Sequence, residues 1–264
     1  MFTEYAKPLS GRIVFDSHAH YDDEAFDPDR DELLAALPQQ GICGVINCGS
    51  DLASSETSLR LAESYPYIYA AVGVHPHEAA AVPEDYLARI SRLAAHPKAV
   101  AIGEIGLDYH YDFSPREVQI SLLSAQLRLA NELGLPVILH DREAHSDMIE
   151  LLEKYRPRGV VHCFSGSVEL AERTLRLGMY IGLGGAVTFK NARKPVEVAR
   201  MVPPDRLLLE TDAPYMAPVP HRGKRCDSSL IAYTAQTIAQ ARGIDAEEVL
   251  RATAENARRL FGIR

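Results

Sequence analysis

Short β-branched runs alternate with amphipathic stretches along almost the whole chain, and this alternation limits the possible folds more than any other feature. Eight apolar runs predict strands at residues 13–15, 44–47, 68–74, 100–104, 137–140, 160–164, 179–183 and 207–210. The stretches between them that have a helical period include 30–37, 86–93, 116–133, 147–154, 168–177 and 196–201. Buried strands that are joined by helices are typical of a parallel sheet.

Eight strand–helix units predict an α/β fold, a single (β/α)8 TIM barrel, and a chain of 264 residues suits one domain over residues 1–264. Two further helical stretches, 230–242 and 246–261, follow the eighth strand and predict an extra C-terminal helix. An open, doubly wound sheet is the alternative. However, no glycine-rich phosphate loop follows the first strand.

The net charge of −8 argues against a sequence-specific DNA-binding protein, because such proteins carry a basic footprint. This charge is compatible with an enzyme that binds a single nucleic-acid end. Residues 1–12 are charged and have no apolar core, so we expect no signal peptide there. No apolar run is long enough to cross a bilayer. We therefore expect a cytoplasmic monomer with no membrane partner.

The four cysteines form no CxxC pair and fit no structural zinc spacing. Cys43 and Cys163 lie in apolar runs and are expected to be small buried residues, whereas Cys226 lies in a polar loop and is expected to be exposed. None of the four, which include Cys48, has an activating base beside it in the sequence, so a catalytic thiol is disfavoured.

Metal-competent side chains follow the predicted strands. His18 and His20 come directly after the first strand, and alternate residues of an extended chain share a face, so the pair can grip one ion. Four more candidates lie near the ends of other strands: Glu104 (fourth), His140 (fifth), His162 (sixth) and Asp212 (eighth). The strand ends of a barrel converge on one mouth, so these six residues predict one metal site.

Mixed nitrogen and oxygen ligands suit zinc, manganese, iron or nickel better than calcium, and magnesium also stays open. We expect two divalent ions, with Glu104 as the bridging carboxylate because it sits between the two histidine sets. Asp212 is expected to bind a metal while it orients the attacking water or takes its proton. Glu104 and Asp212 are therefore the predicted catalytic residues.

Several residues near the predicted mouth are candidates for substrate binding. His75 ends the third strand and is expected to contact a substrate phosphate or the attacking water. Arg222 and Lys224 belong to the densest basic cluster, with His221 and Arg225, and are expected to contact phosphate. Tyr109, with Tyr111 and Phe113, is a candidate for base stacking.

The sequence around His77, His96, His110 and His145 gives little indication of a function. We expect His77 to be exposed at the start of a helix, His110 and His145 to face solvent beside the rim, and His96 to lie on the surface.

Taken together, the motifs of this chain resemble one known family. They are Asp16-Ser-His18-Ala-His20, Gly73-Val-His75-Pro76, Gly103-Glu104-Ile-Gly-Leu-Asp108-Tyr109, His162-Cys-Phe-Ser-Gly166 and Glu210-Thr-Asp212-Ala-Pro-Tyr215, with further matches at 187–191 and 256–261. The set resembles the TatD family of metal-dependent deoxyribonucleases over nearly the whole chain. The resemblance implies 3′→5′ exonuclease activity on DNA, at single-stranded or frayed ends. It also implies a first metal at His18, His20, Glu104 and Asp212, and a second at Glu104, His140 and His162.

Two sequence details bear on the choice of substrate. Many amidohydrolase-type relatives bridge their metals with a carboxylated lysine on the fourth strand. In this chain Glu104 occupies the bridging position, and Lys98 comes too early in the sequence to serve as that lysine. The family usually reads Arg-Gly-Lys-x-Asn-Glu-Pro after the eighth strand, whereas this chain reads Arg222-Gly-Lys-Arg-Cys-Asp-Ser228. Asp227 or Ser228 is expected to cap the next helix.

The departure in this loop leaves the ligands intact but puts the substrate preference in doubt. Hydrolysis of an amide or an ester, such as an aminoacyl-tRNA ester, is the alternative reaction. A barrel that binds metal or nucleotide without turnover is the non-enzymatic alternative, and six apparent ligands count against it.

Overall fold

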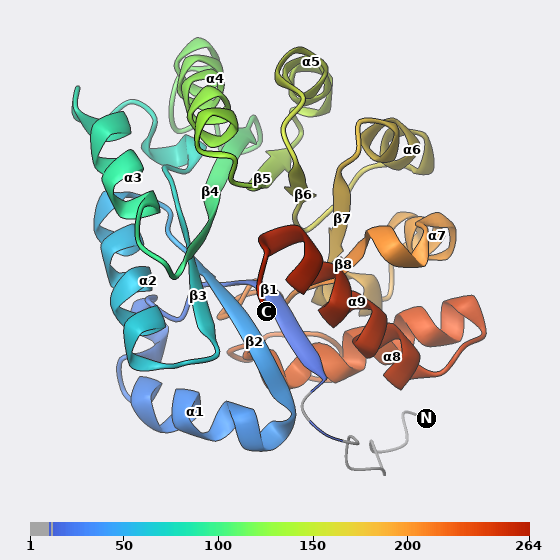
Figure 1. Cartoon of the computed structure of the whole chain (residues 1–264). Coiled ribbons are helices and arrows are strands. Elements are labelled where there is room, and N and C mark those ends of the chain that lie inside the picture. The colour runs from blue at the N-terminus through green and yellow to red at the C-terminus, as the bar shows by residue number, and fades with distance from the viewer. Residues whose placement is uncertain (1–10, 12) are drawn as a thin grey trace.

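The structure is a computed structural model that describes residue 11 and residues 13–264, so the prediction about a signal peptide at residues 1–12 falls almost wholly outside it. Eight parallel strands follow one another in the order of the sequence. Their bounds are β1 Val14–Ala19, β2 Ile42–Cys48, β3 Ile68–Val72, β4 Ala99–Asp108, β5 Val137–Arg142, β6 Gly159–Val161, β7 Tyr180–Leu183 and β8 Leu207–Leu209. The predicted (β/α)8 TIM barrel is thus confirmed (Figure 1).

Helices surround these strands. Their bounds are α1 Arg30–Ala36, α2 Leu52–Ser64, α3 Tyr86–Ala94, α4 Arg116–Leu133, α5 His145–Tyr155, α6 Val168–Arg176, α7 Arg193–Met201, α8 Ile231–Arg242 and α9 Ala246–Phe261. The extra C-terminal helix is α9, which lies across the near end of the barrel in Figure 1. Its Asn256 amide donates to the backbone carbonyls of Pro204 and Leu207 at the start of β8. This end is therefore the amino-terminal end of the strands.

The inside of the barrel is filled by side chains and closed by α9. Buried residues of the strands, such as Phe15, Ile46 and Ile138, form one cluster with Leu260 and Phe261 of α9. Because α9 blocks this end, the functional side chains have only the carboxyl ends of the strands at which to meet solvent.

The seam between β8 and β1 is closed by the segment that follows β8. Ala19 and Ala213 form an isolated parallel bridge, and the N–H of Asp212 donates to the carbonyl of His18 (3.0 Å). The buried Asp16 carboxylate accepts hydrogen bonds from the Thr211 N–H (3.0 Å) and hydroxyl (2.6 Å). These contacts hold the His18 and Asp212 segments side by side.

Several strand boundaries around the site differ from the prediction; for example, β1 runs on to Ala19 and β5 to Arg142, so His18 and His140 lie inside strands. β4 runs on to Asp108, so Glu104 lies inside the strand and not at its end. β3 ends at Val72 and β6 at Val161, so His75 and His162 lie in the segments just beyond. An apolar pattern specifies strand ends poorly, because polar residues continue the ladder of β4, whereas apolar residues such as Val74 and Phe164 lie beyond the ends of β3 and β6.

Helix α2 is absent from the helices named on sequence alone. It contains several serines, which have low helix propensity, and two of them, Ser55 and Ser58, are buried on its inner face. A capping box at Asp51 and Ser54 starts the helix: the Asp51 carboxylate accepts from the Ser54 N–H, and the Ser54 hydroxyl accepts from the Asp51 N–H.

In the part of the chain that the structure describes, none of the helices combines the length and the apolar character needed for a bilayer crossing. The cytoplasmic location, the monomeric state and the single-domain organisation stay predictions.

Candidate metal centre

The six predicted ligands meet at the carboxyl ends of the strands. His18 lies in β1 and His20 directly after it, Glu104 lies in β4, and His140 lies in β5. His162 follows β6, and Asp212 follows β8. The Nε2 atoms of His18 and His20 are 3.0 Å apart, so the predicted shared orientation of this pair is confirmed.

Glu104 occupies the middle of the group, and its two carboxylate oxygens face different histidines. Oε2 lies 3.4 Å from His18 Nε2 and 3.5 Å from His20 Nε2. Oε1 lies 3.0 Å from His140 Nδ1 and 2.8 Å from His162 Nε2. A single carboxylate thus touches both histidine pairs, which is the arrangement that a bridging ligand requires.

Asp212 completes the side of the site that contains His18 and His20. Its Oδ1 lies 3.6 Å from His18 Nε2 and 3.5 Å from His20 Nε2. The two sets are not fully separate, because the rings of His18 and His162 stack with their centroids 3.9 Å apart. Three groups of potential ligands result: His18–His20–Glu104, His18–His162–Asp212 and His75–Glu104–His140.

The spacing of these donor atoms fits a small divalent cation. Imidazole nitrogens bind zinc at about 2.0–2.1 Å, so donors placed tetrahedrally around such an ion lie roughly 3.4 Å from one another. The distances from Glu104 Oε2 and Asp212 Oδ1 to the Nε2 atoms of His18 and His20 cluster around this value. Nitrogen and carboxylate donors at this spacing suit transition metals better than calcium, which prefers oxygen ligands.

Both carboxyl groups are ionised at neutral pH. Burial opposes this, but His162, His18 and His75 lower the pKa of Glu104 well below its ordinary value. Burial likewise opposes ionisation of Asp212, whose pKa is lowered by the hydrogen bond from His20 and by nearby histidines. Burial would also lower the pKa of His20, yet Asp212 and Glu104 raise it to about 9. A cation that binds here is expected to displace protons from the histidines.

Residues around the site hold the outer nitrogens of the histidine rings. His20 Nδ1 lies 2.8 Å from the Cys48 carbonyl oxygen, and His18 Nδ1 lies 3.4 Å from Cys48 Sγ. His140 Nε2 donates to Asp108 Oδ2 (3.0 Å). Partners of this kind fix the ring orientation and leave the other nitrogen free to bind a metal.

His162 has a weaker outer contact, because its Nδ1 lies 3.6 Å from Glu210 Oε1. The same carboxylate accepts the backbone N–H of Cys163, which fixes the start of the segment after β6. Gly182 of β7 leaves the necessary space, because a Cβ at this position would lie 2.5 Å from Glu210 Oε2. Asp108, Glu210 and Cys48 were not predicted as site residues. Asp108 ends β4 and Glu210 follows β8, and both belong to the motifs quoted above, so their positions at strand ends could have identified them.

We expect Asp108→Asn to lower the metal affinity by about 10- to 100-fold, the range found when partners of ligand histidines are changed. The Oδ2 atom of Asp108 accepts from His140, while its Oδ1 accepts the N–H groups of His110 and Tyr111. An amide cannot satisfy both sets, because its NH2 group donates. Titration calorimetry with Zn²⁺ or Mn²⁺ measures the affinity; an unchanged value would show that Asp108 does not orient His140.

His75 lies at the centre, and its predicted contact with substrate stays a prediction. It is buried, and its Nε2 is 3.6 Å from Glu104 Oε1. The prediction that His77 is exposed is wrong: it is partly buried, and its Nε2 lies 3.0 Å from Asp108 Oδ2. Both histidines belong to the turn of η3, Pro76–Glu78, which His75 caps by accepting the His77 N–H (3.2 Å).

The other histidines lie outside the centre. His110 is exposed beside Glu143, as expected, and His145 is partly exposed beside Asp141. His96 lies at the surface beside Glu63.

The basic cluster after β8 is smaller than its sequence suggests. Arg225 is held by two hydrogen bonds to the Asp29 carboxylate (both 2.6 Å) and lies over the Phe26 ring. Arg222 and Lys224 are exposed, and the Arg222 guanidinium lies 4.3 Å from the centre of the Phe189 ring. Arg222 and Lys224 therefore stay candidates for phosphate contact.

Tyr109 is already engaged within the protein. Its hydroxyl donates to Asp147 (2.5 Å), and the guanidinium of Arg116 lies 4.3 Å from its ring centre. Both the polar end and one face of this ring are thus occupied, which counts against its predicted part in substrate binding.

The loop that departs from the family pattern is folded into the core. Cys226 is buried, so the prediction that it is exposed is wrong; its thiol packs among apolar residues even though its sequence neighbours are polar. Asp227 accepts the Ser229 N–H (2.9 Å) and caps η6, Ser228–Leu230, which confirms the predicted cap. The Ser228 hydroxyl donates to the buried Asp16 carboxylate (2.7 Å).

The other cysteines give no support to a catalytic thiol. All four are free; Cys48 is buried, while Cys43 and Cys163 are only partly buried. Burial raises the pKa of each thiol, and that of Cys48 is raised further by the Glu104 carboxylate. These groups therefore stay protonated at neutral pH, when the nucleophilic form is the thiolate.

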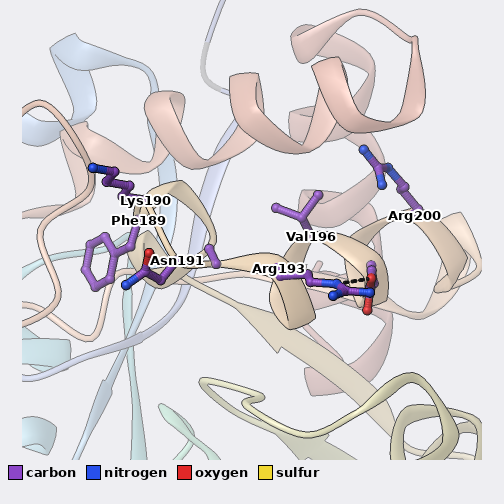
Figure 2. Close-up of a pocket in the computed structure, with 8 residues that line it drawn as sticks. Phe189, Lys190, Asn191, Arg193, Val196 and Arg200 are labelled. Carbon is purple, nitrogen blue, oxygen red and sulfur yellow. Dashed lines mark hydrogen bonds and ion pairs between the residues drawn. The ribbon is translucent and has the colours of Figure 1, made fainter.

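A shallow hollow of about 680 Å³ lies at the segment between β7 and α7 and along α7. Figure 2 shows Phe189, Lys190 and Asn191 at one end of it and Arg193 and Arg200 of α7 at the other. None of its lining residues is a candidate ligand, but Phe189 joins it to Arg222. Arg222 thus borders the Phe189 end of this hollow, whereas Arg193 is paired with Glu197 (3.0 Å).

Comparison with known proteins gives a consistent result. The family model described as TatD related DNase matches residues 15–262. The uncharacterized metal-dependent hydrolase YabD of Bacillus subtilis (strain 168) is 42% identical over 254 residues, which is 95% of this chain and 100% of that protein. The 3'-5' ssDNA/RNA exonuclease TatD of Erwinia tasmaniensis is 38% identical over 259 residues, which is 95% of this chain and 100% of that protein.

Solved structures agree with these relatives. The crystal structure of YjjV, a TatD homologue from Escherichia coli K12, has a TM-score of 0.90 and 34% sequence identity, and the match covers 96% of this chain and 99% of that one.

Proposed function

Because the chain belongs to the TatD family and is a metal-dependent hydrolase that acts on ester bonds, we propose that it is a 3′→5′ exonuclease for single-stranded DNA ends. The observation that carries this proposal is the position of Glu104, whose two oxygens lie within 3.5 Å of histidine nitrogens on both sides. The resemblance of the chain to relatives named as ssDNA/RNA exonucleases supports a nucleic-acid substrate.

We assign two divalent metal ions to the centre. His18, His20, Glu104 and Asp212 would hold the first, and Glu104, His140 and His162 would hold the second. Such a pair would supply a polarised phosphoryl oxygen and a water of lowered pKa. We propose that each ion is zinc, manganese, magnesium or nickel.

The side chains of this chain then have separate roles. Glu104 and the histidines fix the site, while Asp212, whose side chain is one-fifth exposed at the opening, orients the attacking water and accepts its proton. His75 faces the same oxygen of Glu104 as His140 and His162 do, and we propose that it contacts a phosphate oxygen of the scissile linkage or the attacking water.

The rest of the strand would contact cationic side chains. Arg222 and Lys224, in the segment after β8, and Lys190, in the segment after β7, are the cations that we propose for this contact, on a protein with a net charge of −8. Local cations of this kind attract a phosphodiester backbone without the general basic footprint of a duplex-binding protein.

Purified protein tests the proposal when it is incubated with 3′-labelled and 5′-labelled single-stranded oligonucleotides and Mg²⁺, Mn²⁺ or Zn²⁺. We expect immediate release of a 3′-labelled nucleotide and a descending ladder from the 5′-labelled strand, both abolished by a chelator. A descending ladder from the 3′-labelled strand would reverse the direction. If both strands stay intact with every metal, the nuclease proposal fails, and aminoacyl esters and amides become the substrates to test.

A further inference from the structure

Two aromatic side chains in the segment between β4 and α4 are unusually exposed. Tyr111 is 49% exposed and Phe113 is 67% exposed. Their rings stack, with centroids 5.3 Å apart and planes at 23°. The edge of the His77 ring contacts both, at 5.5 Å from Tyr111 and 4.8 Å from Phe113. We refer to Tyr111, Phe113 and His77 as the aromatic ledge. So much exposed aromatic surface contributes little to folding, so another role is expected.

The aromatic ledge adjoins the metal centre. The ring centroid of His77 lies 4.3 Å from that of His75 and 6.3 Å from that of His140. His75 in turn lies 3.6 Å from Glu104. The His75 ring thus lies between the aromatic ledge and Glu104, on the side of Glu104 that faces His140 and His162.

The ledge is held firmly in place. Asp108 Oδ1 accepts the Tyr111 N–H (2.9 Å), and Asp108 Oδ2 lies 3.0 Å from His77 Nε2. The Ser114 hydroxyl, which follows Phe113, donates to the His77 carbonyl (3.1 Å). Asp108 also binds His140, so one carboxylate fixes both the ledge and a proposed ligand. A surface fixed before binding loses little entropy when a ligand docks on it.

A cation borders the ledge. The guanidinium of Arg142, at the end of β5, lies 4.8 Å from the centre of the Tyr111 ring. An aromatic face beside a cation is the combination that binds single-stranded nucleic acid, because the base stacks while the cation meets a phosphate.

We infer that the aromatic ledge stacks the unpaired base of a nucleotide next to the scissile phosphodiester, with Phe113 as the main contact surface. This inference rests on the proposed function, and it supplies a reason for a single-strand preference. Inside a duplex both faces of a base are covered by its neighbours, so only an unpaired or frayed end can offer a face to Phe113. Stacking of this kind tolerates any base, which suits stepwise digestion.

Hydrolysis of oligonucleotides that lack one base tests the inference. Three substrates are compared: a normal strand, one with an abasic 3′-terminal residue and one with an abasic penultimate residue. Because a stacked base adds to the binding of the strand, we expect the substrate that is abasic at the stacked position, whether terminal or penultimate, to have a KM about tenfold higher with wild type. The Tyr111→Ala/Phe113→Ala protein should show the higher KM for the normal strand and no further rise for the abasic one.

Three single variants separate stacking from other effects. Phe113→Trp keeps an aromatic face and should retain the discrimination, whereas Phe113→Leu keeps an apolar side chain and should lose it. Tyr155→Ala removes a ring that lies under Arg128 at the far end of α5 and should behave as wild type. Equal KM values of wild type for all three substrates, or full discrimination by the double variant, would overturn the inference.

A binding measurement separates this inference from the proposed function. An oligonucleotide with 2-aminopurine at the responsive position and a phosphorothioate terminal linkage should lose fluorescence on binding wild type, because stacking quenches the probe. The double variant should bind without that loss. If wild type quenches the probe but hydrolyses no oligonucleotide, the exonuclease proposal fails and the inference of base stacking holds. If wild type hydrolyses oligonucleotides without quenching the probe, only the inference of base stacking fails.

Discussion

Glu104→Gln is expected to lower kcat/KM for oligonucleotide hydrolysis by about a thousandfold, since a metal site contributes several kcal/mol to the transition state and each 1.4 kcal/mol is about tenfold. The glutamine has the same shape but no charge, and its NH2 group cannot bind a metal. Since Glu104 lies against one nitrogen of each of the four histidines proposed as ligands, the variant loses a contact on both sides of the centre at once.

Metal content and rate should fall together in this variant. The content is measured by plasma mass spectrometry after dialysis, and the rate with a 3′-labelled strand. Glu143→Gln is a matched control, because it removes the same charge from an exposed residue that contacts only His110 among the histidines. Glu104→Gln protein with two bound ions and a normal rate would rule out the bridging role.

Asp212→Asn is expected to lower kcat by about 10²- to 10⁴-fold, the range typical of a lost acid–base group, while most of the metal remains bound. His18, His20 and Glu104 still surround the first proposed ion, so a high metal concentration should restore occupancy. It should not restore the rate, because an amide accepts no proton from water.

The control for this variant is Asp112→Asn, which changes an exposed aspartate that contacts Arg116 at 3.4 Å and no histidine. Rates are compared at saturating Mn²⁺ and saturating substrate. Recovery of the wild-type rate at high metal concentration would mean that Asp212 acts as a ligand only.

The order of the elements and the six candidate ligands were predictable because both depend on local patterns. An apolar run of four to eight residues identifies a buried strand, and parallel strands in a barrel all end at one mouth. Residues that follow different strands are therefore brought together by the topology alone. His18 and His140, 122 positions apart in the chain, contact the same Glu104 side chain for this reason.

Individual side-chain environments were not predictable in the same way. Arg225 looked like a phosphate contact, but it is bound to Asp29, which lies 196 positions earlier. Cys226 looked exposed from its neighbours and is buried, and Tyr109 is engaged by Asp147. In each case the partner comes from another part of the chain, so the local sequence carries no signal for it.

The sequence by itself thus determined the barrel, its C-terminal helix and the residue types that meet at its mouth, because periodicity and topology are properties of the chain order. Only the tertiary structure decided how the carboxylate of Glu104 divides between its histidines, that Asp108 holds both His140 and the aromatic ledge, and that Phe113 rather than Tyr109 has a free face. The physical reason is that hydrogen bonds and ring contacts act over about 3–6 Å. Distances of that size between distant residues are fixed only when the whole core has packed.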